Sequence, residues 1–479
     1  MAFETRKIGE AKWQIEKQGA MRVPAVIYAN DNLIEKIKTD RTMGQLTNVA
    51  TMPGIINAAY VMPDAHEGYG FPIGGVAAFD LETGVVSPGG VGYDINCGVR
   101  LIRTDLKADE VKPKMAELID ALFKNVPSGV GSKSKLRLER SELEKALVEG
   151  AEWAVAKGYG WKEDTQHSEE YGRMDGAKPE FVSDMAMKRG APQFGTLGAG
   201  NHFLEVQRVE KVLEEKTAKA FGLFEGQAVL MLHCGSRGFG HQVCDDYLRE
   251  MMPAVKKYNL NLPDRELACV PLGTPEAERY LGAMRCAVNY ALCNRQVMTH
   301  WVRETFEKVF GKSADALGMK LVYDVCHNIA KFEEHEVDGQ RKKVCVHRKG
   351  ATRAFGPGRQ EIPPAYREVG QPVLIPGSMG TASYVLVGTT QAELQSFGST
   401  CHGSGRVMSR SAAIRSFPGQ DVRKSMADKG IVLRGGEGTL VSEEAPGAYK
   451  NVDEVVGSVQ AAGLSRAVAR LVPMGVAKG

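Results

Sequence analysis

The chain lacks the features that mark secreted, membrane-spanning and disordered proteins. No apolar run reaches the roughly 18 residues that a membrane-spanning helix needs, and residues 1–7 contain no apolar stretch typical of a signal peptide. The nine cysteines are an odd number without regular spacing, which does not indicate a disulfide framework. Because 43% of the residues are hydrophobic and 25% are charged, we expect a globular, cytoplasmic protein with reduced thiols.

Two further absences narrow the possible activities. The net charge of +3 is too small to indicate a polyanionic partner, so local basic clusters would have to recognise one. Many ligases form a nucleotidyl-lysine within a Lys-x-Asp-Gly motif, but here the lysine position holds Arg173 before Asp175 and Glu336 before Asp338. The sequence therefore argues against a ligase that uses a lysine nucleophile.

The pattern of apolar segments predicts one α+β domain over residues 1–479, with antiparallel and mixed sheets flanked by helices. Neither an internal repeat nor a low-complexity linker divides the chain. Short apolar runs at 73–79, 228–232 and 320–325 predict buried strands. Two of these strands are followed closely by a histidine.

Three segments show helical periodicity. They lie around residues 108–124 and 136–157 and, for the longest helix, from Pro275 to about Phe310. Thr274 can cap that last helix, and a proline is well tolerated in a first helical turn. We expect these helices to cover the sheets.

Side chains typical of metal ligands occur at five distant positions. Asp94 and Cys97 share a glycine-flanked turn, whereas His202, His233 and His327 each have polar or glycine neighbours. For any one of them, an inert buried thiol or a core histidine is the commoner explanation. Their joint occurrence favours a metal site. Since five donors exceed what one tetrahedral ion binds, a two-metal centre with a shared ligand is a further hypothesis.

His402 lies in a glycine-rich turn, Cys401 to Arg406, which we predict to open a helix through residues 411–414. Backbone amides at a helix start bind anions. An imidazole there could attack a phosphorus atom, with Arg406 stabilising the phosphoryl oxygens. A further metal ligand and an ordinary loop histidine are the alternatives.

Two glycine-rich loops, 235–238 and 376–380, would allow a phosphate close to the backbone. Basic residues also cluster at 133–137, 341–343 and 347–353. Ordinary turns between strands explain the two loops equally well. Runs of charged residues usually form solvated surfaces, so RNA contact is the less common explanation for each basic cluster.

Several of these segments together resemble the RtcB family of GTP-dependent RNA ligases, which join RNA 3′-phosphate or 2′,3′-cyclic phosphate ends to 5′-hydroxyl ends. The resemblance rests on residues 62–75, 92–100, 200–203 and 347–353 and on the loop around His402. These motifs occur in the family's order and span essentially the whole chain. The fold and the activity of the family are therefore expected here.

The resemblance implies that Cys97 bridges two Mn(II) ions, with Asp94 and His202 completing one site and His233 and His327 the other. Nitrogen, oxygen and sulfur donors also bind Zn(II) at least as tightly. It further implies that GTP guanylylates His402 with release of pyrophosphate. The GMP then passes to an RNA 3′-phosphate, and the 5′-hydroxyl attacks that activated end as GMP leaves. A cyclic phosphate is first opened by hydrolysis.

A nucleotide pocket is also implied by the resemblance. In it, Glu205 would accept hydrogen bonds from the guanine edge and Tyr449 would stack on the base. Lys478 would otherwise be interpreted as a frayed tail residue. The expected members are Asn201, His202, Phe203, Leu204, Glu205, His327, Asn328, Pro376, Gly377, Ser378, Met379, Ser383, His402, Gly403, Ser404, Gly405, Tyr449 and Lys478.

Arg237 and Arg406 are expected to contact RNA terminal phosphates, and Arg348, Lys349 and Arg353 to form a surface that follows the RNA backbone. We expect a monomer that acts on RNA such as cleaved tRNA halves, with an archease activator as a family association.

Two other functions stay open. A metal-dependent phosphoesterase would use the same donors to activate water and would turn over without GTP. A non-catalytic RNA-binding protein would bind RNA without forming product.

Overall fold

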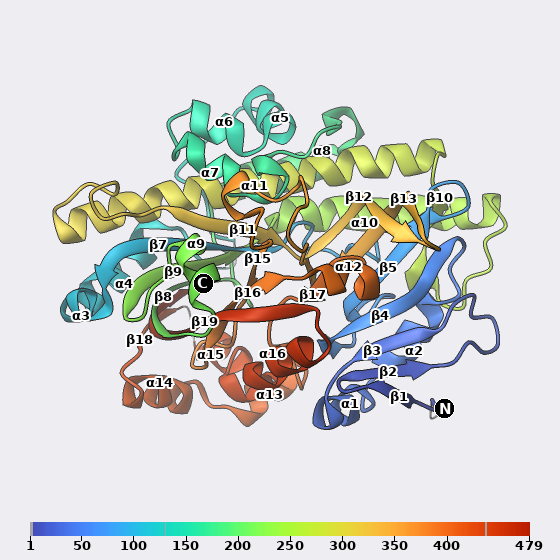
Figure 1. Ribbon diagram of the computed structural model, residues 1–479. Helices are drawn as coiled ribbons and strands as arrows, with labels where there is room; N and C mark the ends of the chain where they lie inside the picture. The colour runs from blue at the N-terminus through green and yellow to red at the C-terminus, as the bar shows by residue number, and fades with distance from the viewer. Residues whose placement is uncertain (1–2, 130, 436–437) are drawn as a thin grey trace.

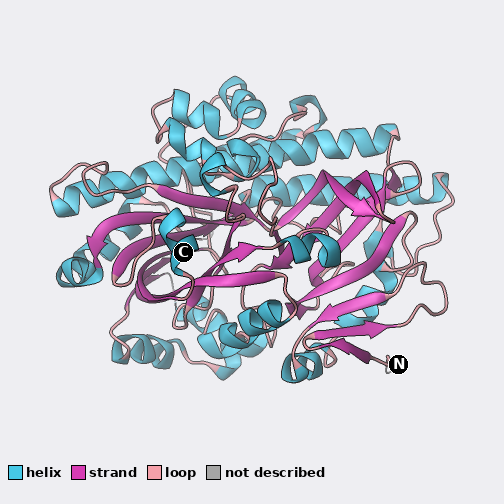
Figure 2. Cartoon of the chain, viewed as in Figure 1, coloured by secondary structure: helices cyan, strands magenta, loops and turns pink. Residues whose placement is uncertain are grey.

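Two large β-sheets form the framework of the computed structural model, which describes residues 3–129, 131–435 and 438–479 (Figures 1 and 2). The first sheet has seven strands, and its neighbours are antiparallel except for the parallel pair β3 and β4. In spatial order its strands are β1 (Arg6–Gly9), β2 (Lys12–Ile15), β3 (Ala25–Tyr28), β4 (Ile55–His66), β5 (Ile73–Asp80), β13 (Gln340–Lys349) and β12 (Asn328–Val337).

The second sheet has eight strands and contains the chain's C-terminal strand. All neighbours are antiparallel except β18 (Val432–Gly435), which pairs in parallel with β19. Its other strands, in spatial order, are β11 (Leu321–Cys326), β7 (Gly98–Lys107), β9 (Gln227–Cys234), β8 (Phe203–Val212), β19 (Ser465–Lys478), β16 (Ser383–Gly388) and β15 (Pro372–Ile375). Two small ladders pair β6 (Val85–Val86) with β10 (Val270–Pro271) and β14 (Ala351–Arg353) with β17 (Ser399–Cys401).

Helices cover the outer faces of the two sheets, and the long α11 (Pro275–Phe310) crosses the top of the molecule in Figure 1. No helix among the residues that the structure describes is long and apolar enough to cross a bilayer. The other helices are α1 (Asp31–Ile37), α2 (Thr42–Val49), α3 (Ala108–Val111), α4 (Met115–Asn125), α5 (Arg140–Glu149), α6 (Ala151–Ala156), α7 (Lys162–Gln166), α8 (Asp184–Gly190), α9 (Glu215–Phe221), α10 (Arg237–Lys257), α12 (Thr390–Ser396), α13 (Arg410–Ser416), α14 (Gly419–Asp428), α15 (Gly438–Glu443) and α16 (Val452–Ala461).

This architecture confirms the predicted α+β class, the three predicted strands and the bounds of α11. The hydroxyl of Thr274 accepts a hydrogen bond from the amide of Ala277, as expected of a cap. The other two predicted helices are each interrupted. In the segment 108–124 a 3₁₀ turn at Lys112–Lys114, which contains a proline, separates α3 from α4. In the segment 136–157 Gly150 adopts φ +60° and separates α5 from α6.

Four neighbouring strands of the second sheet bring distant residues to one edge. In the order β11-β7-β9-β8 every pair is antiparallel, so the starts of β7 and β8 lie beside the ends of β9 and β11. Cys97 precedes β7, His202 precedes β8, and His233 is the penultimate residue of β9. His327 lies between β11 and β12, where the chain passes from the second sheet to the first. The sheet order alone therefore gathers these four side chains.

A buried arginine on α11 fixes the backbone behind this edge. Arg295 donates to the carbonyls of Asn96 and Cys234 at 2.8 and 2.9 Å, and its Nε donates to Asp324 at 3.0 Å. Asp324 also accepts from Arg100, and the side chains of both arginines and the aspartate are fully buried. One guanidinium thus links the segments that carry Cys97, His233 and His327.

Replacing Arg295 with Met should lower the free energy of unfolding by about 3–5 kcal/mol, because it leaves buried carbonyls and part of a buried carboxylate without donors. Arg249→Met is the matched control, since that side chain is 77% exposed and should change stability by less than about 0.5 kcal/mol. Denaturant unfolding of both variants without added metal measures the difference. Equal stability of the two variants would contradict the structural role of Arg295.

Candidate metal centre and nucleotide cavity

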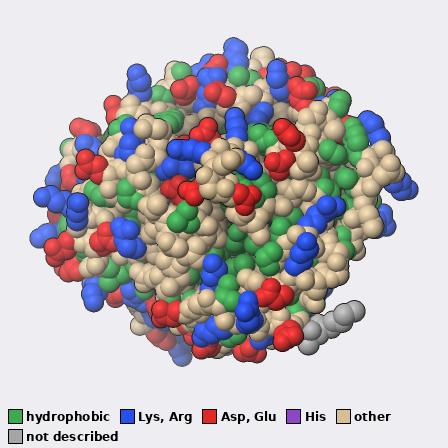
Figure 3. All heavy atoms as spheres, turned by 45° about the vertical axis from the view of Figure 1, so that its right-hand side comes forward, with side chains coloured by type: hydrophobic (Ala, Val, Ile, Leu, Met, Phe, Trp, Pro, Cys, Tyr) green, Lys and Arg blue, Asp and Glu red, His purple; other side chains and the backbone are tan. Residues whose placement is uncertain are grey.

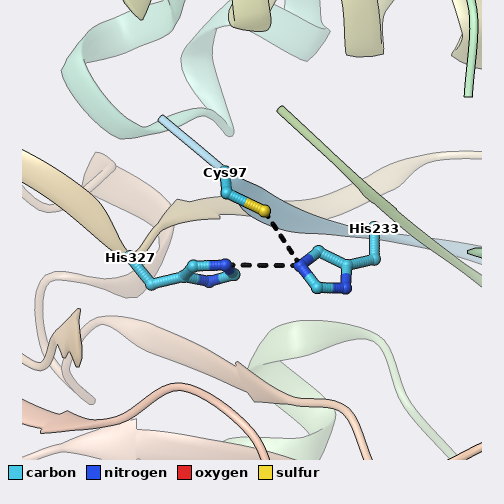
Figure 4. Close-up of side chains that lie close together, drawn as sticks. All are labelled: Cys97, His233 and His327. Carbon is cyan, nitrogen blue, oxygen red and sulfur yellow. Dashed lines mark hydrogen bonds between the residues drawn. The ribbon is translucent and has the colours of Figure 1, made fainter. Parts of the chain in front are cut away.

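Cys97, His233 and His327 point their donor atoms at one another (Figure 4). The Sγ of Cys97 lies 3.2 Å from Nε2 of His233, which lies 3.3 Å from Nε2 of His327. All three residues are buried. The arrangement is suited to a metal ion, because each residue offers one ligand atom toward a common point.

A second group of donors shares the same thiol. Oδ2 of Asp94 lies 2.9 Å from Nε2 of His202, and that nitrogen lies 3.4 Å from Sγ of Cys97. Asp94, Cys97 and His202 also satisfy the geometry of a metal-binding triad. Cys97 is therefore common to two possible sites, as the resemblance to the RtcB family implies.

The tautomers of the histidines support a cation here. Nδ1 of His202 lies 3.1 Å from the carbonyl of Leu197, and Nδ1 of His233 lies 3.1 Å from the carbonyl of Asn201. A carbonyl only accepts, so each Nδ1 carries a proton and each Nε2 is turned toward Cys97. The pKa of His233 is lowered by burial, so its Nε2 offers a lone pair, whereas the nearby thiols and Asp94 raise the pKa of His202. Imidazole nitrogens, a thiol and a carboxylate that converge in this way fit a metal.

Burial shifts the pKa values of three side chains in the cluster. Burial raises the pKa of the Cys97 thiol to about 12 and lowers the pKa of His233 and of His327 well below the usual value. A metal ion would lower the pKa of Cys97 again, because it stabilises the thiolate. Metal binding should therefore release a proton from Cys97.

Asp94 is held by backbone groups on both sides. Its Oδ1 accepts from the amide of Ser236 at 2.9 Å, and its carbonyl accepts from the side-chain amide of Asn328 at 3.0 Å. A Cβ on Gly235 would lie 2.4 Å from Oδ1 of Asp94, so the carboxylate reaches that amide only because position 235 has no side chain.

His402 lies directly after β17, beside the cluster. Its ring centroid is 4.9 Å from that of His327, and its Nδ1 is 2.5 Å from Oδ2 of Asp64 in β4. The same Oδ2 accepts from the amides of His402 and Gly403 at 3.0 and 3.2 Å. Burial by itself raises the pKa of Asp64, but the neighbouring His402 and Lys450 hold it below its usual value. Asp64 thus remains an acceptor for His402.

The position of His402 corrects one expectation. The helix α13 begins at Arg410, eight residues after His402, and the side chain of Ser409 caps it. The amides around His402 belong to an irregular loop, and Oδ2 of Asp64 already accepts two of them. His402 is therefore not at a helix N-terminus, because Arg406, in an isolated β-bridge with Tyr449, and a bend at residues 407–408 separate it from the helix.

One cavity of about 1540 Å³ contains the metal cluster, His402 and most of the predicted nucleotide pocket. Leu204 and Ser383 fall outside its lining. Leu204 alternates with Phe203 and Glu205 along β8 and is buried on the other face, and the hydroxyl of Ser383 accepts from Gln207. The predicted residues that line the cavity are Asn201, His202, Phe203, Glu205, His327, Asn328, Pro376, Gly377, Ser378, Met379, His402, Gly403, Ser404, Gly405, Tyr449 and Lys478.

Charged and aromatic groups in this cavity are interlinked. Lys478 is buried in β19 and lies 3.5 Å from Glu444, so it is not a frayed tail residue. The hydroxyl of Tyr449 donates to Glu444 and accepts from Arg406 at 3.1 Å. Burial raises the pKa of Glu205 to about 8, although Gln207 donates to its carboxylate.

The predicted RNA-binding surface at residues 348–353 is wrong. Arg348 is fully buried and donates two hydrogen bonds to Glu333 at 2.6 and 2.8 Å, and Arg353 is buried beside Glu170. Lys349 lines the cavity, but its ammonium group donates to two backbone carbonyls. For Arg348 and Lys349 the reason is that β13 lies inside the first sheet, between β5 and β12, whereas Arg353 lies in β14, which pairs with β17. By contrast, Arg237 and Arg406 do line the cavity.

The surface offers no large basic patch in their place on the face that Figure 3 shows. Lysine and arginine side chains there are interspersed with aspartate and glutamate. This pattern agrees with the small net charge of +3.

Comparison with known proteins identifies the family. The family model described as "tRNA-splicing ligase RtcB" matches residues 45–479. The chain belongs to the RtcB family. The RtcB protein of Thermococcus kodakarensis, named tRNA-splicing ligase, is 60% identical over 475 residues, which cover 99% of this chain and 98% of that relative.

Other relatives with the same name also match from end to end. The RtcB protein of Aeropyrum pernix is 56% identical over 479 residues, covering 99% of both chains, and that of Nanoarchaeum equitans is 50% identical over 480 residues, covering 100% of both. The RtcB fold therefore extends over the whole chain.

Asp64 is the site residue to which the sequence interpretation gave no role. It lies within residues 62–75, which carry the resemblance, next to His66 and in a proline-containing strand. A carboxylate in the middle of a buried apolar strand was the available signal, because a buried charge needs a partner.

Cys97→Ala should reduce binding at both metal groups, because the thiol belongs to each, whereas Asp94→Ala should mainly weaken one. We expect at least a tenfold loss of affinity at each affected group. Metal titration with calorimetry and elemental analysis measures the stoichiometry. Cys269→Ala, at a buried cysteine outside the cluster, is the control. Two tightly bound ions in Cys97→Ala would contradict the shared ligand.

Proposed function

We propose that this chain is a GTP- and Mn(II)-dependent RNA ligase that joins 3′-phosphate or 2′,3′-cyclic phosphate ends to 5′-hydroxyl ends in tRNA splicing and RNA repair. Membership of the RtcB family makes the chain an RNA ligase of tRNA splicing. The observation that supports the detailed chemistry is the position of His402, fixed by Asp64, beside the donor cluster that shares Cys97.

His402 is the proposed nucleophile. The carboxylate of Asp64 faces Nδ1 of His402 and would hold the proton on that nitrogen. The lone pair of Nε2 would then be free to attack the α-phosphorus of GTP. A nitrogen–phosphorus bond forms as the bond to the pyrophosphate leaving group breaks. The ionised Asp64 stabilises the positive charge that develops on the ring, as an acidic partner does for other nucleophile–histidine systems.

The two donor groups around Cys97 would each hold one Mn(II) ion, which would neutralise charge on the phosphoryl oxygens. The protein contributes the buried geometry of Asp94, His202, His233 and His327. The choice of manganese rests on the family resemblance, since the donor set also accepts zinc.

The rest of the cavity would bind the guanine and the RNA end. Glu205 would accept hydrogen bonds from the guanine edge, Tyr449 would stack on the base, and Lys478 would face the nucleotide. GMP would pass from His402 to the RNA 3′-phosphate, and the 5′-hydroxyl would then displace GMP. Arg237 and Arg406 line the same cavity and would contact the terminal phosphates.

The setting of this activity follows from the same resemblance. Cleaved tRNA halves or other broken RNAs would be the substrates. We propose a cytoplasmic monomer with one catalytic domain over residues 1–479, assisted by an archease activator.

His402→Ala should abolish covalent labelling by GTP labelled at the α-phosphate in the presence of Mn(II), because the variant has no acceptor nitrogen. Asp64→Asn should slow labelling by about 100-fold or more, since an amide no longer fixes the reactive tautomer. His300→Ala, at a histidine outside the cavity, should label like the wild type. The measurement is the amount of acid-labile label that stays on the protein, detected by gel electrophoresis.

The same assay separates the alternatives. Undiminished labelling of His402→Ala would refute the nucleophile assignment. Release of phosphate from RNA ends without GTP, and without any protein label, would indicate a phosphoesterase.

The affinity for GTP should rise with pH up to about 8. Burial raises the pKa of Glu205 to about 8, and guanine N–H donors favour its ionised form, so binding below that pH releases a proton. The affinity should increase at most tenfold per pH unit and then level off. Glu205→Gln should bind GTP more weakly and lose this component. Calorimetry from pH 6 to 9 on the wild type and on Glu205→Gln measures the GTP affinity at each pH. The same change of affinity with pH in both proteins would contradict the role of Glu205.

A further inference from the structure

Three rings from separate elements meet at the wall of the catalytic cavity, on the side of Asp94. The ring centroids of Tyr69 and Tyr93 are 5.7 Å apart at 70°, and those of Tyr93 and His241 are 5.6 Å apart at 31°. Tyr69 lies between β4 and β5, Tyr93 directly precedes Asp94, and His241 lies in the first two turns of α10. All three line the cavity that holds the metal cluster.

Several core tyrosines use their hydroxyl group to bind the backbone, whereas Tyr69 and Tyr93 do not. Tyr28, Tyr247 and Tyr290 each donate their hydroxyl to a backbone carbonyl at 2.7–2.8 Å. Within the described ranges, the hydroxyls of Tyr69 and Tyr93 form no hydrogen bond with protein. Both tyrosines are half-buried, and His241 is exposed. The cluster therefore presents aromatic surface to the cavity.

The backbone holds the two tyrosines in place. Lys349 donates to the carbonyl of Tyr69 at 2.6 Å, and a Cβ on Gly92 would lie 3.4 Å from the Lys349 side chain. The amide of Gly70 donates to Glu266 at 2.8 Å. The buried Lys349 thus fixes the backbone at Tyr69 and leaves little room beside Gly92, which precedes Tyr93.

The charges around the cluster suit a nucleobase with its phosphate to one side. Arg189 and Arg237 line the cavity, and both help to lower the pKa of His241. Glu266 and Asp245 lie near the tyrosines and raise their pKa values further than burial alone, so both phenols stay neutral. A neutral ring surface next to cations is the combination by which proteins bind single-stranded nucleic acid.

We propose that Tyr69, Tyr93 and His241 form a stacking platform for a nucleobase of the RNA end that reacts at the metal cluster. This inference rests on the proposed RNA ligase function and adds a subsite to it. The platform is separate from the guanine contacts assigned to Glu205 and Tyr449. Because a ring face accepts any base, it would hold the RNA end without requiring a particular sequence.

The test uses the full chain and RNA oligonucleotides that carry 2-aminopurine at the terminal nucleotide, one at a 3′-phosphate end and one at a 5′-hydroxyl end. GTP is omitted, so no ligation occurs. Stacking should quench the fluorescence of at least one of the two RNAs when it binds the wild type. Tyr69→Leu and His241→Leu should lose this quenching and bind that RNA about 5- to 100-fold more weakly. His241→Phe keeps a planar ring and should retain the quenching.

Tyr159 and His300 provide a matched control. Their rings form a similar pair, 5.4 Å apart at 84°, outside the cavity. Tyr159→Leu and His300→Leu should bind and quench like the wild type. All four Leu variants should accept label from GTP with an unchanged KM, because the guanine lies elsewhere.

Three results would overturn the platform. They are no quenching of either RNA by the wild type, full quenching by both Tyr69→Leu and His241→Leu, or a raised KM for GTP with unchanged RNA affinity. The third result would place the guanine on these rings. Failure of the proposed ligase function looks different, since the wild type itself would then accept no label from GTP.

Discussion

The crowding of electron-pair donors around Cys97 is the constraint on which the rest of the site depends. A thiol, a carboxylate and three imidazoles approach within a few ångströms, and the outer ring nitrogens of His202 and His233 face backbone carbonyls. Donors of this kind that converge on one point are suited to a cation. The strand order and Arg295 hold the donors together.

His402, the proposed nucleophile, and the donor cluster around Cys97 come from different parts of the framework. Asp64, which fixes His402, belongs to the first sheet, whereas Cys97, His202 and His233 lie at an edge of the second. His327 is the residue at which the chain passes from one sheet to the other. The site therefore exists only when both sheets are assembled, and the cavity between these elements is where nucleotide and RNA could meet.

Buried charge explains why basic residues misled the sequence interpretation. Arg348 and Arg353 occur in a run of cations, which in most proteins is a solvated face, but here they pair with Glu333 and Glu170 in the interior. These acids lie 15 or more residues away along the chain, so no local pattern reveals the pairing. The helix expected after the His402 loop is present as α13, but His402 does not lie at its start, because the side chain of Ser409 caps it.

The sequence alone determined the α+β class, the long helix with its Thr274 cap, the five candidate metal ligands and the histidine near them, because these depend on residue type, local periodicity and a distinctive set of motifs. The resemblance also implied that Cys97 is shared, and its geometry agrees with that. Only the tertiary structure decided that Asp64 contacts His402 and that Tyr69, Tyr93 and His241 share one wall. Each of these contacts joins residues that strand pairing and helix packing bring together, and sequence spacing does not encode that distance.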